Sequence, residues 1–146
     1  MTPKEARRRF ASARLAHLAT SDAHNRPHVV PVVFAVEADT VYSAVDHKPK
    51  RTTQLRRLAN IAENPAVALL VDYYDDDDWD RLWWARAEGT GRLVVPGSEE
   101  HRLALSRLKS RYVAYQDQPP TGSVVAVDVG RWSGWSASAN PAGNEL

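Results

Sequence analysis

Apolar residues along the chain form six segments with the pattern of β-strands. Valine and other β-favouring residues alternate with polar ones or form a short unbroken run, as strands buried on one or both faces do. Proline, glycine, aspartate and asparagine separate the segments and favour turns. The predicted strands are Leu15–Thr20, His28–Val36, Thr40–Val45, Ala66–Val71, Trp83–Val95 and Ser123–Val129.

Three other segments place apolar residues three and four positions apart, which is typical of amphipathic helices. Residues 3–13 begin with a proline, which suits a first helical turn. Residues 52–63 end shortly before Pro65, since proline disfavours helical backbone in the residue that precedes it. The third helix follows Ser98, a favourable N-cap with two glutamates directly after it.

The order of elements predicts a mainly β, α+β fold. Strands outnumber helices and most connections between strands are hairpin-like, so we expect an antiparallel barrel with helices packed around it. The length of 146 residues fits one domain, which we assign to residues 1–135. The small, polar residues 136–146 are expected to form a flexible C-terminal tail.

The absence of cysteine excludes disulfides and thiolate chemistry. No apolar run approaches the roughly 20 residues of a membrane span, and no secretory signal is recognised, so a cytoplasmic location is expected. Residues 1–60 carry eleven Lys and Arg against five Asp and Glu. Such a basic half suits an anionic small molecule or nucleic acid. The scarcity of aromatic residues there argues against nucleic acid.

The strongest candidate for binding chemistry lies between the third strand and the second helix. Its sequence is His47-Lys48-Pro49-Lys50-Arg51-Thr52-Thr53. Backbone N–H groups at a helix N-terminus favour an anion, arginine can bind phosphate with two hydrogen bonds, and lysines add mobile charge. The alternative is a solvated basic turn. The pattern of a nucleoside-triphosphate loop is absent.

Other chemistries find less support. The five histidines show no metal-ligand spacing, and the run Asp75–Asp78 lacks the glycine and distal glutamate of a calcium loop, so no metal site is predicted. Pro31 lies within a strand, which places it at an edge, at a bulge, or where the backbone faces a ligand. Trp83 and Trp84 point to opposite faces; one can line the barrel, and the other must face a helix, a subunit or a ligand.

Three segments together resemble the pyridoxamine-5′-phosphate-oxidase-like split β-barrel superfamily, and within it the actinobacterial coenzyme F420-dependent oxidoreductases. They read RPHVVPVVF, YSAVDHKPKRTTQLRRLANIAENPAVALLVD and DDDDWDRLWWARAEGTGRL. The resemblance implies a six- or seven-stranded split barrel and a homodimer with cofactor sites between protomers. It implies cofactor-binding residues on two strands, on the basic segment and on the partner's cleft: Val30, Pro31, Val32, Ser43, Lys48, Lys50, Arg51, Thr52, Thr53 and Trp84.

The resemblance implies an oxidoreductase that moves a hydride between F420, a deazaflavin, and a small unsaturated substrate. Arg56 and Arg57 favour F420, because its lactyl-polyglutamate tail is strongly anionic. FMN binding on the same fold and a non-catalytic F420 carrier are the alternatives. No counterpart of the substrate-phosphate residues of pyridoxamine phosphate oxidases is found. Catalytic residues remain unassigned, and a proton donor is solvent, Tyr42, Tyr73 or Tyr74.

Overall fold

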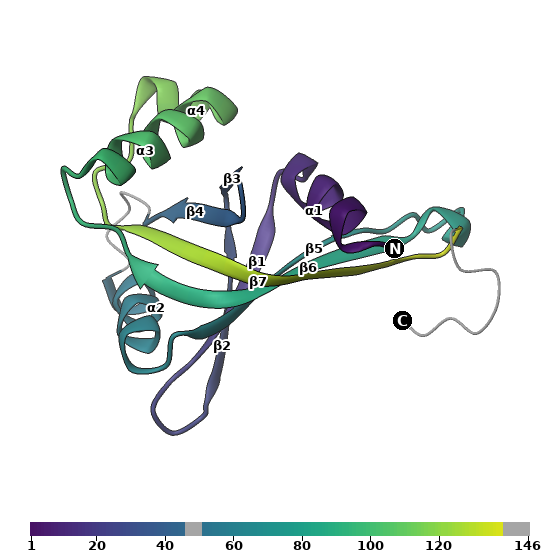
Figure 1. Ribbon diagram of the computed structural model, residues 1–146, viewed down its shortest axis with the longest axis horizontal. Coiled ribbons are helices and arrows are strands. Elements are labelled where there is room, and N and C mark those ends of the chain that lie inside the picture. Colours follow the sequence, from purple (N-terminus) through teal and green to yellow (C-terminus); the bar gives the residue numbers. More distant parts are fainter. Residues whose placement is uncertain (46–50, 139–146) are drawn as a thin grey trace.

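One seven-stranded sheet organises the protein (Figure 1). The computed structural model describes residues 1–45 and 51–138, with side chains from residue 56 onward in the second range. Neighbouring strands pair antiparallel throughout the described residues, and the strand order is β2-β1-β5-β6-β7-β4-β3. The strands are β1 (Ala16–Ser21), β2 (Pro27–Val32), β3 (Ala35–Glu37), β4 (Thr40–Ala44), β5 (Ala66–Tyr73), β6 (Trp83–Leu93) and β7 (Val124–Ser136). This curled sheet with flanking helices confirms the predicted split β-barrel.

Helices pack on different parts of the sheet. The first contacts β6 and β7, the second contacts β1 and β6, and the third contacts β3 and β4. Figure 1 shows α2 and the long arm of β5, β6 and β7 at opposite ends of the molecule. The helices are α1 (Pro3–Ser12), α2 (Arg51–Glu63), α3 (Glu99–Arg111) and α4 (Val113–Asp117), with a 3-10 turn, η1, at Trp79–Arg81.

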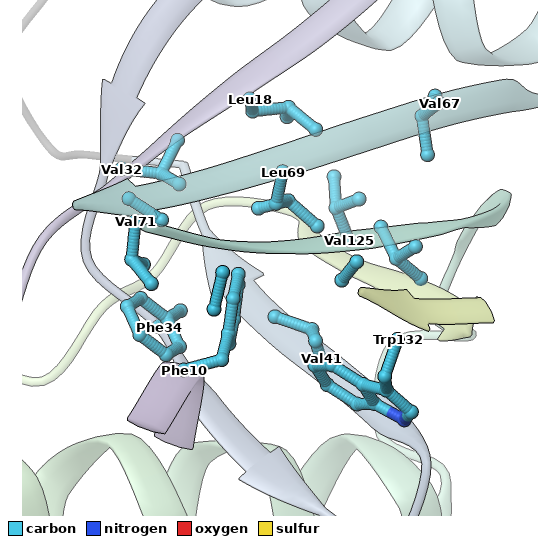
Figure 2. Close-up of a cluster of buried hydrophobic side chains, with 14 of the residues drawn as sticks. Phe10, Leu18, Val32, Phe34, Val41, Val67, Leu69, Val71, Val125 and Trp132 are labelled. Atoms are coloured by element: carbon cyan, nitrogen blue, oxygen red, sulfur yellow. The ribbon is translucent and has the colours of Figure 1, made fainter. Parts of the chain in front are cut away.

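The main core lies between α1 and the concave face of the sheet. Phe10 of α1 is fully buried and contacts two aromatic rings, with centroid distances of 4.9 Å to Phe34 and 5.3 Å to Trp132. Figure 2 shows these rings beside aliphatic side chains that project from the strands, among them Leu69 and Val71. A smaller apolar cluster fills the space under α3. The alternation of buried and exposed residues along the strands therefore decides which face of the sheet packs against the core.

The strand predicted over His28–Val36 is wrong in its extent, because the structure divides it into β2 and β3. The chain leaves β1 after Val32 and pairs with β4 from Ala35 onward. Phe34 lies between them, and its N–H donates to the hydroxyl of Tyr112 while its carbonyl accepts from the same hydroxyl. The side chain of Tyr112, distant in the sequence, thus satisfies the backbone N–H and C=O of Phe34, which neither strand pairs. Apolar periodicity does not reveal such a contact.

The last strand is longer than predicted and extends to Ser136. Its pairing with β6 shifts register between Glu88 and Gly89. Arg131 pairs with Glu88 and Val129 pairs with Gly89, so Gly130 is the inserted residue of a bulge. The glycine that resembles a strand terminator in the sequence is therefore a bend inside a continuous strand. Of the tail predicted over residues 136–146, Ser136 is a buried residue of β7 and the N–H of Ala137 donates to the carbonyl of Leu82, while residues 139–146 lie outside the described residues.

Candidate functional site

The basic segment connects β4 to α2, as predicted. β4 ends at Ala44, and α2 begins at Arg51, so Arg51, Thr52 and Thr53 form the first helical positions. The partial positive charge of a helix N-terminus favours an anion at this point. Lys48 and Lys50 lie outside the described residues, as do the side chains of the first five residues of α2.

The strand that carries Pro31 is at the edge of the sheet, which confirms one of the three expected settings for this proline. Pro31 pairs with His17 of β1, and its ring is exposed. Val30 and Val32 direct their side chains into the core and are 7% and 5% exposed. Any ligand beside β2 therefore meets Pro31 and the backbone of the two valines, and their side chains act as core.

Ser43 lies next to this strand with its hydroxyl engaged. It is buried, and its Oγ donates to the carbonyl oxygen of Val33 at 2.9 Å. This bond joins β4 to the connection between β2 and β3. Ser43 thereby holds β4, which precedes the basic segment, to the chain that follows β2.

A hollow of about 200 Å³, here called the Pro31 hollow, lies between these elements. It is lined by Leu15, Pro31, Val32, Val33, Ala44, Arg57 and Tyr115. Arg57 comes from the second turn of α2 and is only 9% exposed. Its Nε has no hydrogen-bond partner among the described residues, and burial lowers the pKa of its guanidinium. A buried, unsatisfied cationic donor is costly without an acceptor.

From the sequence alone, Arg57 has only a general role as one of two cations that favour an anionic tail. Its burial depends on how α2 packs against β1, through the hydrogen bond from Asn60 Nδ2 to Thr20 Oγ1 at 3.1 Å and through Ile61 in the core. Helical spacing did place Arg57 off the apolar stripe. Only the tertiary contact of α2 turns that position towards the hollow.

A second pocket, here called the basic pocket, adjoins the same helix. It has a volume of about 330 Å³ and is lined by Asp22, Arg26, Pro27, His28, Arg56 and Asn60. Arg26 pairs with Asp22 at 2.7 Å, whereas no described carboxylate pairs with Arg56. Burial lowers the pKa of His28, and the charges of Arg56 and Arg57 lower it further. The Nδ1 of His28 has no partner among the described residues. The pocket therefore suits an anion.

Trp84 lies on the outer face of the sheet, whereas Trp83 packs beside α1 with the guanidinium of Arg9 5.5 Å from its ring. Trp84 is aligned with Asp72 of β5 and Trp135 of β7. With residues of the β5–β6 connection they form a groove of about 570 Å³, here called the aromatic groove. The groove is lined by Leu70, Asp72, Tyr73, Tyr74, Trp79, Leu82, Trp83, Trp84, Arg86 and Trp135.

One chain does not bring Trp84 to the basic segment. On β7, Val124 pairs with Ala44 just before that segment, and Trp135 pairs with Trp84. Eleven residues separate Val124 from Trp135, or about 35 Å along a strand at roughly 3.3 Å per residue. The Pro31 hollow and the aromatic groove are therefore two separate features of the protomer.

Two of the three tyrosines that the sequence offered as proton donors have a hydrogen-bonded hydroxyl. The hydroxyl of Tyr42 donates to Glu100 Oε2 at 2.8 Å under α3, and burial together with this bond raises its pKa to about 12. The hydroxyl of Tyr74 donates to Asp76 at 2.9 Å, and the ring of Tyr73 lies 5.4 Å from the guanidinium of Arg81. None of the three lines the Pro31 hollow.

The curled antiparallel sheet and its flanking helices define a split β-barrel protein. The sequence model of the pyridoxamine 5′-phosphate oxidase family matches residues 2–136, and the chain belongs to that family. The family resemblance predicted from the sequence is thereby confirmed. No helix within the described residues is long and apolar enough to cross a membrane.

Known proteins resemble this chain either in sequence or in fold. A 5a,11a-dehydrotetracycline/5a,11a-dehydrooxytetracycline reductase of Streptomyces rimosus is 32% identical over 85 residues, which is 58% of each protein. The matched region thus spans less than two thirds of that relative. A FAD-binding protein from Mesorhizobium loti has a TM-score of 0.70 at 17% identity, covering 92% of this chain and 94% of that one. The haem storage protein HutZ from Vibrio cholerae has a TM-score of 0.69 at 17% identity, covering 93% and 95%. These structural likenesses concern the fold.

Proposed function

We propose that the protein is a coenzyme F420-dependent reductase that moves a hydride to a small, flat, unsaturated substrate. The observation that carries the proposal is the buried Arg57, which lines the hollow beside Pro31 and whose Nε has no hydrogen-bond partner among the described residues. A buried guanidinium with a free donor fits the anionic ribityl phosphate of a flavin-like cofactor. Family membership and the reductase of Streptomyces rimosus support a redox role.

The residues of the chain would hold the cofactor rather than react with it. Lys48, Lys50, Arg51, Thr52 and Thr53 would bind the phosphate at the N-terminus of α2. Arg57 would supply a desolvated donor beside it. Pro31 offers an exposed ring and no N–H, so the ring system of the cofactor would lie along Val30, Pro31 and Val32. The deazaflavin supplies the hydride chemistry, and the protein positions it and excludes water.

The basic pocket of Arg56 and His28 supports F420 over FMN. Both cofactors carry a ribityl phosphate, but only F420 adds a tail of several carboxylates. Arg56, without a described carboxylate partner, and His28, with an unpartnered Nδ1, offer that tail a second anchor. FMN is the second candidate, because the Pro31 hollow recognises the part that both cofactors share.

The active form would be a homodimer in which each site combines the Pro31 hollow of one copy with Trp84 of the other. The separation of these features within one chain supports this arrangement. So does the outer face of the sheet, where four buried polar atoms lack a hydrogen-bond partner among the described residues. They are Arg86 Nε, Glu88 Oε2, Ser133 Oγ and Trp135 Nε1.

Titration with F420 and with FMN, followed by tryptophan fluorescence, tests the proposal. F420 should bind with a dissociation constant below roughly 100 µM and more tightly than FMN. Arg57→Met keeps the length and apolar part of the side chain, and should weaken both cofactors by tenfold or more, since it removes a charged hydrogen-bond donor worth about 1.5–3 kcal/mol. Arg102→Met on the exposed side of α3 is the matched control.

The outcomes separate the alternatives. FMN binding more tightly than F420 would identify an FMN flavoprotein. F420 binding without oxidation of reduced cofactor across a panel of enones and quinones would identify a carrier. If neither cofactor binds, or if Arg57→Met and Arg102→Met bind equally well, the assignment of the Pro31 hollow is wrong.

A further inference from the structure

The aromatic groove is lined by aromatic rings, whose flat faces suit a flat molecule. Trp84 and Trp135 are cross-strand neighbours on the outer face, and Leu70 lies beside them on β5. Trp79 of η1, which is 62% exposed, adds a ring from the connection between β5 and β6. Large exposed rings that gather in one concavity usually mark a binding surface. A volume of about 570 Å³ is in the range of small-molecule sites.

The groove already accommodates cations over its rings. The guanidinium of Arg86 lies 5.0 Å from the centroid of Trp84, and that of Arg81 lies 5.4 Å from Tyr73. No described cation covers the ring faces of Trp79, Tyr74 or Trp135. Those faces are therefore available for a further cation–π contact.

The charge around the groove is strongly negative. Residues 72–81 contain six aspartates and one arginine. Arg81 is paired with Asp75 at 3.0 Å, and Arg86 is 3.8 Å from Glu88, so the two nearby cations already face carboxylates. The carboxylate of Asp72, which lines the groove beside Trp84, makes no hydrogen bond or ion pair with any described residue. An unpaired carboxylate at the edge of an apolar groove favours a cationic ligand.

We propose that the aromatic groove binds a flat, apolar molecule that carries an amine cation, with its rings against Trp84 and Trp135 and its ammonium group beside Asp72. The groove would be the substrate side of the redox site, and in this respect the inference rests on the proposed function. The substrate class is then narrower than a flat unsaturated molecule. It is a polycyclic amine, and its positive charge distinguishes it from neutral quinones and enones of the same shape.

Three fluorescent probes with one ring system test the inference directly: aminomethylanthracene, hydroxymethylanthracene and anthracene carboxylate. Their affinities are measured by fluorescence anisotropy on the full chain without cofactor. The cationic probe should bind about tenfold more tightly than the neutral one, which is what one cation–π contact and one partly desolvated ion pair supply. The anionic probe should bind most weakly. The preference for the cation should shrink as salt is added.

Two variants locate the site. Asp72→Asn should abolish most of the preference for the cationic probe and leave the affinity for the neutral probe unchanged, whereas Asp117→Asn, an exposed carboxylate on α4, should preserve the preference. Trp79→Leu should weaken all three probes together, since it removes a ring and no charge. Both altered residues of the groove are exposed, so the far-ultraviolet circular dichroism and thermal midpoint should not change.

Equal affinity for the three probes, or the same preference in Asp72→Asn and Asp117→Asn, would overturn the inference. So would probe affinity that falls as the protein concentration is raised, because a second copy would then cover the groove. The proposed function is tested separately by the cofactor titration. Selective binding of the cationic probe without binding of F420 or FMN would support the groove and reject the redox role.

Discussion

Two arginines illustrate how similar side chains acquire different roles. Arg57 is buried without an acceptor for its Nε, whereas Arg92 is fully engaged. Arg92 donates two hydrogen bonds to Glu100, at 2.6 and 2.8 Å, and two to Asp128, at 2.7 and 3.1 Å. Arg92 therefore holds α3 to β6 and β7. Arg57 has the unsatisfied donor that a ligand site requires.

The Arg92 network should make stability depend on pH. Its hydrogen bonds lower the pKa of Glu100 and Asp128 below their ordinary values of about 4. Because these carboxyl pKa values are depressed in the folded state, their contribution is present above about pH 4.5 and is lost as pH falls through the folded values. Arg92→Met should lower the unfolding free energy by about 1–2 kcal/mol at pH 7, allowing for partial solvent screening.

Urea denaturation of Arg92→Met and the parent protein, at pH 7 and near pH 3, checks this expectation. The difference between the two proteins should narrow at the lower pH. Arg107→Met is the control, because Arg107 makes one exposed pair with Glu37 at 2.7 Å. A difference for Arg92→Met that stays the same at both pH values would contradict the prediction.

His28 reports on the basic pocket. Its pKa is lowered first by burial and then by the charges of Arg56 and Arg57. Arg56→Gln removes one of these charges, so it should raise the pKa of His28 towards its ordinary value of about 6.5. Proton NMR titration of the imidazole measures the change. Binding of a carboxylate-rich tail in this pocket should raise the same pKa, and an unaltered His28 titration in Arg56→Gln would show that the two residues are not coupled.

At the scale of elements, the bulge between β6 and β7 decides the shape of the arm. The backbone of Gly89 passes so close to β7 that an added Cβ would lie 2.1 Å from the carbonyl oxygen of Asp128. At Gly130, on the other strand of the bulge, the nearest atom to an added Cβ is Glu88 O at 3.9 Å. The close approach of β7 therefore requires glycine at position 89, whereas position 130 has room for a larger side chain.

Gly89→Ala should destabilise the protein by at least about 1–3 kcal/mol, because the clash is with backbone and the strands must move apart. Gly130→Ala should have a much smaller effect, since the space is open. Chemical denaturation of both variants gives the comparison. Equal effects would mean that the close approach at Gly89 does not constrain the arm.

At the scale of the molecule, the Pro31 hollow and the aromatic groove lie near opposite ends of β7. Each lacks what the other supplies. The hollow has a buried cation and an edge strand but no tryptophan in its lining, while the groove has tryptophans and a carboxylate but lies far from the basic segment. The proposed homodimer would join one of each.

Mixed dimers provide the sharpest test of this arrangement. Arg57→Met and Trp84→Ala should each abolish tight F420 binding as pure dimers. Refolding a one-to-one mixture should restore about a quarter of the sites, because half of the dimers are mixed and each has one intact site. F420 stoichiometry measured by fluorescence gives the fraction. No recovery, with each variant folded by circular dichroism, would show that both residues serve the same protomer's site or that no shared site exists.

The sequence by itself determined most of the elements, because local patterns control them. Alternating valines predicted the strands, Pro65 and Ser98 marked helix boundaries, and a proline inside a strand limited that position to an edge, a bulge or backbone that faces a ligand. The position of the basic segment between a strand and a helix followed from the same patterns. The family was predicted from the resemblance of three longer segments.

Tertiary structure alone decided what depends on contacts between distant residues. Tyr112 satisfies the backbone of Phe34 across 78 residues, which divides one predicted strand into two. The packing of α2 buries Arg57, and strand order aligns Asp72, Trp84 and Trp135 into one groove. Local sequence specifies backbone conformation through nearest-neighbour sterics and hydrogen bonds, whereas burial and charge neighbourhoods arise only when the sheet brings separate segments together.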